Sequence, residues 1–182
     1  MSGKRAFDLA VSAAGLLISA PLLCLLAVAV KLTSKGPALF CQRRVGRGQR
    51  AFVCLKLRTM HAGTPSVPTH EAPAGSMTRL GAFLRRWKLD ELPQLWNVLK
   101  GEMSLVGPRP CLPDQHELIG ERRERGVFTI RPGVTGLAQV SGVDMSDPVR
   151  CAELDARYMT AMGWRADLAI LLRTFARRHA NG

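Results

Sequence analysis

The sequence predicts a mainly helical α+β protein, with a membrane-embedded helix over residues 1–36 and a small globular domain over residues 37–182. Three observations carry this prediction. Residues 9–30 form an uncharged, apolar run. Two short β-type runs flank a glycine turn near residue 47, and helical apolar periodicity recurs after residue 78. A chain of 182 residues has room for one ordinary domain beside such a helix.

The apolar run from Leu9 to Val30 is long enough, at about 33 Å as a straight helix, to cross a bilayer. A cleaved signal peptide fits poorly, because Asp8 enters the run directly and uncharged residues continue beyond Pro21. A soluble core helix would be unusually long. A spanning helix and a re-entrant hairpin remain.

Pro21 favours the re-entrant form, since it removes a backbone hydrogen bond and is expected to break the helix near Ser19. The Ser19 hydroxyl can satisfy a carbonyl freed at the break. Basic residues flank both ends of the run, and the positive-inside rule places such flanks in the cytoplasm. A hairpin keeps both flanks inside, whereas a spanning helix leaves one outside.

Short elements follow the apolar run. Residues 37–42 and 51–57 are predicted strands, joined by a turn at Gly46-Arg47-Gly48. His61 to Met77 is rich in proline and lacks hydrophobic periodicity, which predicts a mobile loop. Thr78 is a candidate cap for a helix with Leu80, Phe83, Leu84 and Trp87 on one side.

Asp90 and Glu91 precede a helix with Pro93 in its first turn, where its missing N–H costs nothing. The spacing of its apolar residues predicts one buried face, made of Leu92, Leu95, Trp96 and Leu99. The helix dipole favours ionised carboxylates at this end. The pair is therefore either an acidic helix cap or a catalytic pair, in which both could bind Mg²⁺ or one could act as a nucleophile.

Basic side chains stand at rigid or extended positions along the chain. Lys56 and Arg58 end the second predicted strand and share a face if the strand persists. Arg109 lies between two prolines, and Arg131 precedes a proline–glycine turn. Each alone is typical of an ordinary surface turn. Together with the carboxylate pair, they indicate phosphate chemistry beside a metal ion.

The net charge of +12 predicts a polyanionic partner, while a single tyrosine and six phenylalanines argue against a nucleic-acid stacking surface. Five cysteines without a C-x-x-C pair favour a reducing compartment. Near the C-terminus, apolar residues alternate with arginines over residues 164–178. That pattern fits a helix on an anionic membrane surface, or a core helix with a solvated basic face.

The order of these motifs resembles the bacterial sugar transferases, and within them the small monotopic phosphoglycosyl transferases. The resemblance covers nearly the whole chain. It rests on Lys4-Arg5-x-x-Asp8, the proline-centred apolar run, Lys56-x-Arg58-Thr59-Met60, Leu89-Asp90-Glu91-Leu92-Pro93-Gln94, Ser104 to Pro110, and Arg131 to Gly136. One departure is that Ala20 precedes Pro21, where many members carry serine, so that Ser19 stands one position early.

The resemblance implies a monotopic enzyme on the cytoplasmic face of a bacterial inner membrane. It would transfer a phospho-sugar from a nucleotide sugar, usually a UDP-sugar, to polyprenyl (undecaprenyl) phosphate, with Mg²⁺ and release of UMP, as the first membrane step of glycoconjugate synthesis. From the apolar run and the few aromatic residues, we expect no nucleic-acid partner.

The resemblance also implies roles for individual residues. Asp90 would form a covalent phospho-sugar intermediate, and Glu91 would help to hold the metal. Phosphate charge would be neutralised by Lys56, Arg58, Arg109 and Arg131, and Asp155 would be a further site member. The alternative is a non-catalytic, basic adaptor protein at the membrane surface.

Overall fold

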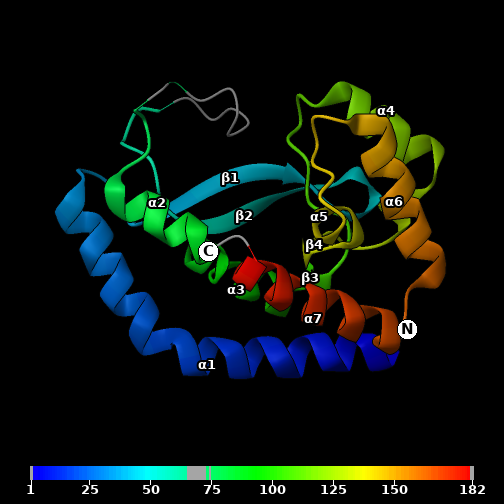
Figure 1. The fold of residues 1–182 in the computed structure, drawn as a ribbon, viewed down its shortest axis with the longest axis horizontal. Helices are drawn as coiled ribbons and strands as arrows, with labels where there is room; N and C mark the ends of the chain where they lie inside the picture. The colour runs from blue at the N-terminus through cyan, green and yellow to red at the C-terminus, as the bar shows by residue number, and fades with distance from the viewer. Residues whose placement is uncertain (1, 65–72, 74, 181–182) are drawn as a thin grey trace.

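A computed structural model describes residues 2–64, 73 and 75–180, and the fold is mostly helical (Figure 1). One long helix, α1, runs along one side of a compact domain that lies within its bend. The elements, in chain order, are α1 (Ser2–Thr33), β1 (Leu39–Val45), η1 (Arg47–Gln49), β2 (Ala51–Leu57), α2 (Arg79–Arg86), η3 (Leu89–Glu91), α3 (Gln94–Lys100), β3 (Ser104–Val106), α4 (His116–Glu124), η4 (Val127–Thr129), β4 (Gly133–Thr135), α5 (Leu137–Val140), α6 (Pro148–Ala161) and α7 (Trp164–Ala180).

Helix α1 holds a stretch, Gly3–Thr33, that is long and apolar enough to cross a membrane, and only 6% of its apolar window is buried. The helix bends sharply about half-way along, with Pro21 inside it (Figure 1). The expected break is thus a bend within continuous helix. Ser19 Oγ donates to the Gly15 carbonyl at 2.6 Å, one turn earlier. The carbonyl that Pro21 leaves without a donor belongs to Leu17. The Ser19 hydroxyl therefore bonds to a different carbonyl from the one that Pro21 frees.

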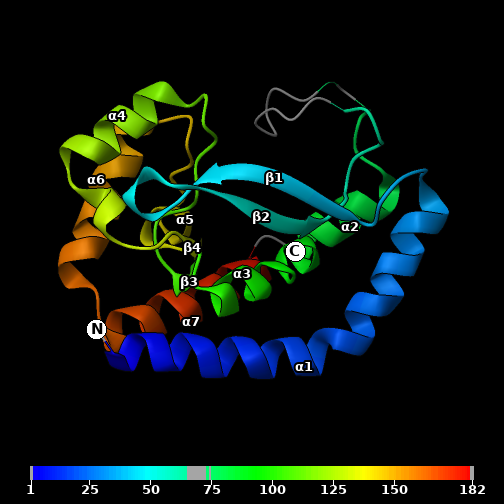
Figure 2. The ribbon, with the colours of Figure 1, turned by 180° about the vertical axis from the view of Figure 1, so that it is seen from behind.

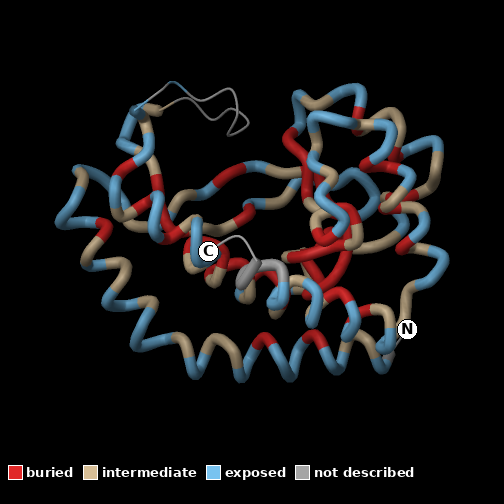
Figure 3. The backbone as a smooth tube through the Cα atoms, in the orientation of Figure 1, coloured by how far each residue is buried: buried red, intermediate tan, exposed pale blue. Residues whose placement is uncertain are grey.

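Both ends of α1 are fixed to the globular domain. Near its start, Asp8 is buried and accepts a hydrogen bond from Ser104 Oγ at 2.8 Å, while Lys4 forms an ion pair with Asp167 of α7. Near its end, Val30 packs against Leu57 and Leu84. Figure 3 shows exposed positions recurring along the whole helix. The domain therefore holds α1 near both of its ends and leaves an apolar face uncovered.

The predicted β-hairpin is confirmed. Strands β1 and β2 pair antiparallel from Leu39↔Leu57 to Val45↔Ala51, with η1 at the turn. Figure 2 shows the hairpin from behind, and β2 contacts η3 and α3. The first strand runs three residues beyond its predicted end at Gln42. The second strand has the predicted bounds, and it ends at Leu57, so that Arg58 lies outside it.

The predicted Thr78 cap of α2 is also confirmed, since Thr78 Oγ1 accepts from the Gly81 N–H at 2.8 Å. Of the predicted apolar side, Leu84 is buried, whereas Phe83 and Trp87 are about half exposed. The loop predicted over residues 61–77 falls partly on residues 65–72 and 74, which lie outside the described part of the chain.

The predicted buried face of the next helix is wrong. Gln94, Asn97 and Val98 are the buried residues of α3, and Trp96 is 53% exposed. The reason is the edge of β2, whose backbone groups need partners. Asn97 accepts from Leu55 N at 3.0 Å and donates to the Val53 carbonyl at 2.7 Å. These bonds turn the polar side of α3 inward.

Two proline–glycine segments, residues 104–110 and 131–136, are joined by backbone hydrogen bonds, and we call this pairing the glycine clasp. Strands β3 and β4 pair in parallel, and the clasp continues beyond them as Gly107 N donates to the Thr135 carbonyl at 2.9 Å. A Cβ on Gly107 would lie 2.5 Å from the Arg131 carbonyl oxygen, so only glycine fits. The clasp fixes the backbone immediately before Arg109.

We predict that Gly107→Ala destabilises the protein by about 1–3 kcal/mol, because the new methyl group forces the two motifs apart. Chemical unfolding in detergent measures this loss. Gly120→Ala in α4 is the matched control, since a Cβ there meets nothing within 4 Å. Equal stability of the two variants would contradict the clasp.

Candidate active site

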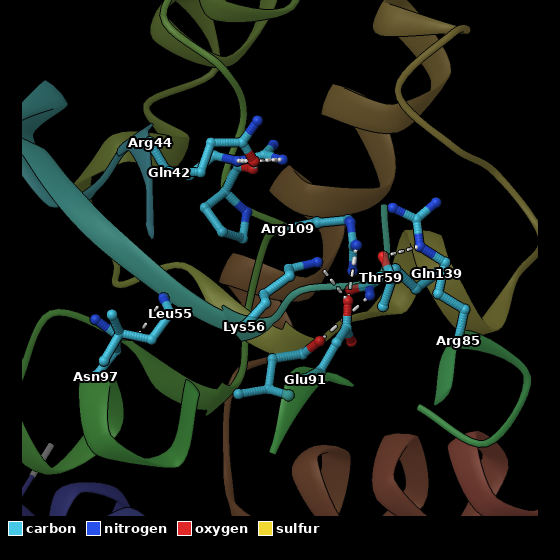
Figure 4. A network of polar contacts seen from close by, with 12 residues as sticks. Gln42, Arg44, Leu55, Lys56, Thr59, Arg85, Glu91, Asn97, Arg109 and Gln139 are labelled. Carbon is cyan, nitrogen blue, oxygen red and sulfur yellow. Dashed lines mark hydrogen bonds and ion pairs between the residues drawn. The ribbon is translucent and has the colours of Figure 1, made fainter. Parts of the chain in front are cut away.

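Two cations converge on one carboxylate oxygen at the centre of the domain (Figure 4). Lys56 Nζ lies 2.8 Å and Arg109 Nη2 lies 2.9 Å from Glu91 Oε1. Lys56 comes from β2, Glu91 from η3, and Arg109 from the segment after the clasp. Three segments distant in sequence thus meet at one oxygen atom.

Burial and charge together fix the protonation of this cluster. Burial acts to raise the pKa of the Glu91 carboxyl, but the charges of Arg109 and Lys56 outweigh it and hold that pKa well below its ordinary value. Burial, and then the charge of Arg109, lowers the pKa of the Lys56 ammonium. Glu91 is therefore an anion throughout the physiological range.

Asp90 lies beside Glu91 in a different electrostatic environment. Its side chain is buried, and its Oδ1 has no hydrogen-bond partner among the residues the structure describes. Burial, and then the charge of Glu91, raises the pKa of the Asp90 carboxyl above its ordinary value. A buried carboxylate oxygen without a partner is costly unless a ligand or reacting atom uses it.

The backbone at this point supports the presentation of both carboxylates. Lys88, just before η3, adopts a left-handed conformation with φ of 55°, which is uncommon for a residue other than glycine. The following 3-10 turn places Asp90 and Glu91 before α3. This strained turn is typical of functional sites.

The pair fits Mg²⁺ by its chemistry. Among the described residues Asp90 Oδ1, a hard oxygen, has no hydrogen-bond partner, and Glu91 is the next residue in the chain. Within the described part of the chain, no group of three or more metal-binding side chains occurs. Magnesium sites commonly use one or two carboxylates, with water and substrate phosphates completing the coordination.

Arg109 is held from behind by a buried ion pair. Arg122 Nη1 donates to the Arg109 carbonyl at 2.8 Å, and its Nη2 lies 2.7 Å from Asp155 Oδ2. The side chains of Arg122 and Asp155 are each 2% exposed. Asp155, which was expected as a site member, contacts Arg122, and Arg122 in turn contacts Arg109 of the ion cluster.

The structure places two of the four predicted cations elsewhere. Arg58 donates to the Ser34 carbonyl at 2.7 Å and to Ser34 Oγ at 2.9 Å, at the end of α1. It leaves the Lys56 face because β2 ends at Leu57. Arg131 Nε donates to the Gly101 carbonyl at 2.8 Å.

Sequence reasoning missed Arg122 and Arg85. Arg85 Nε donates to Thr59 Oγ1 at 2.9 Å, and its charge acts on Asp90 (Figure 4). Arg122 stands in the run Glu121 to Glu124, which is indistinguishable from a solvated helix face. In the sequence, Arg85 similarly cannot be distinguished from the other arginines on the surface of its helix.

Comparison with known proteins defines the class. The family model "Bacterial sugar transferase" matches residues 1–180, and the chain belongs to this family. It is 42% identical to an undecaprenyl-phosphate glucose phosphotransferase of Komagataeibacter xylinus, covering 97% of this chain and 36% of that protein. It is also 42% identical to a UDP-glucose:undecaprenyl-phosphate glucose-1-phosphate transferase of Caulobacter vibrioides, covering 94% of this chain and 67% of that protein.

A third relative has another sugar in its name. The UDP-N-acetylgalactosamine-undecaprenyl-phosphate N-acetylgalactosaminephosphotransferase of Aeromonas hydrophila is 35% identical, over 94% of this chain and 42% of that protein. The chain thus spans about a third to two thirds of the length of these relatives.

We predict that Asp155→Ala destabilises the protein by about 3–5 kcal/mol, since it leaves the Arg122 charge buried without its partner. Urea unfolding measures the loss. Glu121→Ala is the control, because it removes a more exposed ion pair with Arg125 and costs about 1 kcal/mol or less. A similar cost for both variants would show that Asp155 does not support Arg122.

Proposed function

We propose that this protein transfers a sugar phosphate from a UDP-sugar to undecaprenyl or another polyprenyl phosphate, giving polyprenyl-diphosphate-sugar and UMP. The names of its relatives support this general reaction. The mechanism rests on one observation, which is that the two carboxylates of the pair have different hydrogen-bond and ion-pair partners. Glu91 is bound by two cations, whereas Asp90 keeps a buried oxygen without a protein partner among the described residues.

In the first step, an Asp90 carboxylate oxygen attacks the phosphorus that carries the sugar. The bond from this phosphorus to the oxygen bridging the two phosphates breaks, and UMP leaves with that oxygen. In the second step, a phosphate oxygen of the acceptor attacks the same phosphorus, and the Asp90 carboxylate is restored. One site can thus serve a soluble and a lipid substrate in turn.

Charge neutralisation makes this attack possible, because an anion approaches a diphosphate poorly. Arg109 and Lys56 supply fixed positive charge, and Glu91 holds both in place. Asp90 and Glu91 would hold Mg²⁺, which when bound would neutralise further phosphate charge.

We further propose that α1 is re-entrant, with both ends on the cytoplasmic side, and that residues 1–36 form the membrane segment beside a catalytic domain at 37–182. The ion pair of Lys4 with Asp167 and the contacts of Val30 tie both ends to one domain. A straight spanning helix would separate its ends by a bilayer thickness. The bend and the exposed apolar face fit a hairpin in one leaflet.

Helix α7 supplies a second contact with the membrane in this proposal. Trp164, Leu168, Leu172 and Phe175 are 46–67% exposed along it. Arginines of the same helix, including Arg165 and Arg173, can pair with anionic lipid headgroups. A protein held in this way is monotopic on the cytoplasmic face.

We predict that Asp90→Asn lowers sugar-phosphate transfer by at least about 1,000-fold, since the amide oxygen is a poor nucleophile. Glu91→Gln should also abolish transfer, because it releases Lys56 and Arg109. UMP release in the presence of acceptor measures both. Asp114→Asn, on an exposed loop, is the control and keeps wild-type activity. Full activity of Asp90→Asn would refute the covalent mechanism, and no transfer by the wild type with any UDP-sugar would favour the adaptor function.

We predict that cysteines introduced as Ser2→Cys and Lys35→Cys, each after removal of the exposed Cys24 and Cys41, both escape an impermeant thiol reagent added outside intact cells. Ser2 begins α1 and Lys35 follows its end, and a hairpin keeps both positions inside. Labelling in lysed cells shows that each thiol is reactive. External labelling of one position alone would establish a spanning helix.

A further inference from the structure

A cavity of about 670 Å³ opens beside the ion cluster. Glu91 and Arg109 form part of its wall, and most of the other lining residues are apolar. Its apolar residues come from α3, β3, α5 and α7, and include Leu95, Leu105, Ala138 and Leu171. The volume lies within the range of small-ligand sites.

The cavity connects the ion cluster with the apolar surface of the protein. Trp87 and Phe175, which are 48% and 56% exposed, both line it. Leu95, also in the wall, is the side chain that a Cβ on Gly15 of α1 would meet, at 3.1 Å. One end of the cavity is therefore charged, and its walls reach the helices that carry the exposed apolar face.

Three other polar side chains of the wall, Thr135, Thr174 and Asp144, are hydrogen-bonded within the protein. Thr135 Oγ1 and Thr174 Oγ1 lie 2.8 Å apart, and Thr174 also donates to the Ile170 carbonyl. Asp144 Oδ1 accepts from the N–H and hydroxyl of Ser146. A nucleobase needs hydrogen bonds from its pocket, whereas a hydrocarbon chain needs only apolar contact.

We infer that this cavity binds the first isoprene units of the lipid acceptor, with the acceptor phosphate at the Glu91–Arg109 end. The inference rests on the proposed function and names the substrate that occupies this side of the site. Charge complementarity orients the acceptor, because Arg109 attracts its phosphate, and Arg86 and Lys88 add positive charge to the wall. The hydrocarbon then extends from the ion cluster along the apolar wall.

The test fills the cavity and follows the two half-reactions separately. Leu171→Trp narrows the wall, and Val143→Phe narrows it from the loop after α5. Leu172→Trp is the matched control, because Leu172 is the next residue of α7, is 61% exposed and does not line the cavity. Tryptophan at this position also keeps the apolar contact with the membrane that is proposed for α7. The acceptor is farnesyl phosphate or geranyl phosphate, and UMP release without acceptor reports the donor step.

Both cavity variants should raise the KM for farnesyl phosphate by about tenfold or more, since each buried methylene contributes about fourfold to affinity. The UMP burst without acceptor should match that of Leu172→Trp. The wild type should prefer farnesyl to geranyl phosphate, and the cavity variants should lose this preference.

A higher KM for the UDP-sugar, or a lost burst with an unchanged acceptor KM, would overturn the inference and assign the cavity to the nucleoside. Kinetics identical to those of Leu172→Trp in both variants would exclude the cavity as a substrate site. In either case the proposed function stands. Absence of UMP release from the wild type would instead remove the proposed function, and the inference with it.

Discussion

The ion cluster at Glu91 is the interaction on which the rest of the structure depends. Lys56 and Arg109 would repel each other in the interior, and a single carboxylate oxygen holds them together. Breaking such a buried arrangement by removing one partner costs about 3–5 kcal/mol, because the remaining charges lose their compensation. The same arrangement leaves positive charge beside Asp90. Stability and the proposed chemistry therefore draw on one set of contacts.

The supports of this cluster explain several features of the fold. The glycine clasp between β3 and β4 fixes the backbone before Arg109, and Arg122 holds the Arg109 carbonyl from behind. Asp8 of α1 accepts a hydrogen bond from Ser104, at the start of the strand that leads into the clasp. The apolar helix is thereby joined to the segment that presents Arg109. If α1 is embedded in the membrane as proposed, this connection would place the phosphate chemistry close to the membrane surface.

The local elements were predictable because their signals are local. The hairpin strands, the Thr78 cap and the carboxylate pair follow from turn chemistry, capping and charge over a few residues. Long-range contacts decided the rest. The hydrogen bonds of Asn97 to the edge of β2 orient the polar side of α3 inward. Strand β2 ends at Leu57, one residue before Arg58, and Arg58 therefore points to Ser34 and not to the site. Nothing in the local sequence distinguishes buried Arg122 from its exposed neighbours.

In the proposed mechanism, Asp90 carries the sugar phosphate between the two substrates. The most direct measurement is the intact mass of the protein after incubation with a UDP-sugar and Mg²⁺ in the absence of lipid acceptor. We expect a mass increase of one sugar phosphate, located at Asp90 by peptide mapping and lost when polyprenyl phosphate is added. Normal turnover with acceptor, but no adduct under any of these conditions, would contradict it and indicate direct transfer between the substrates.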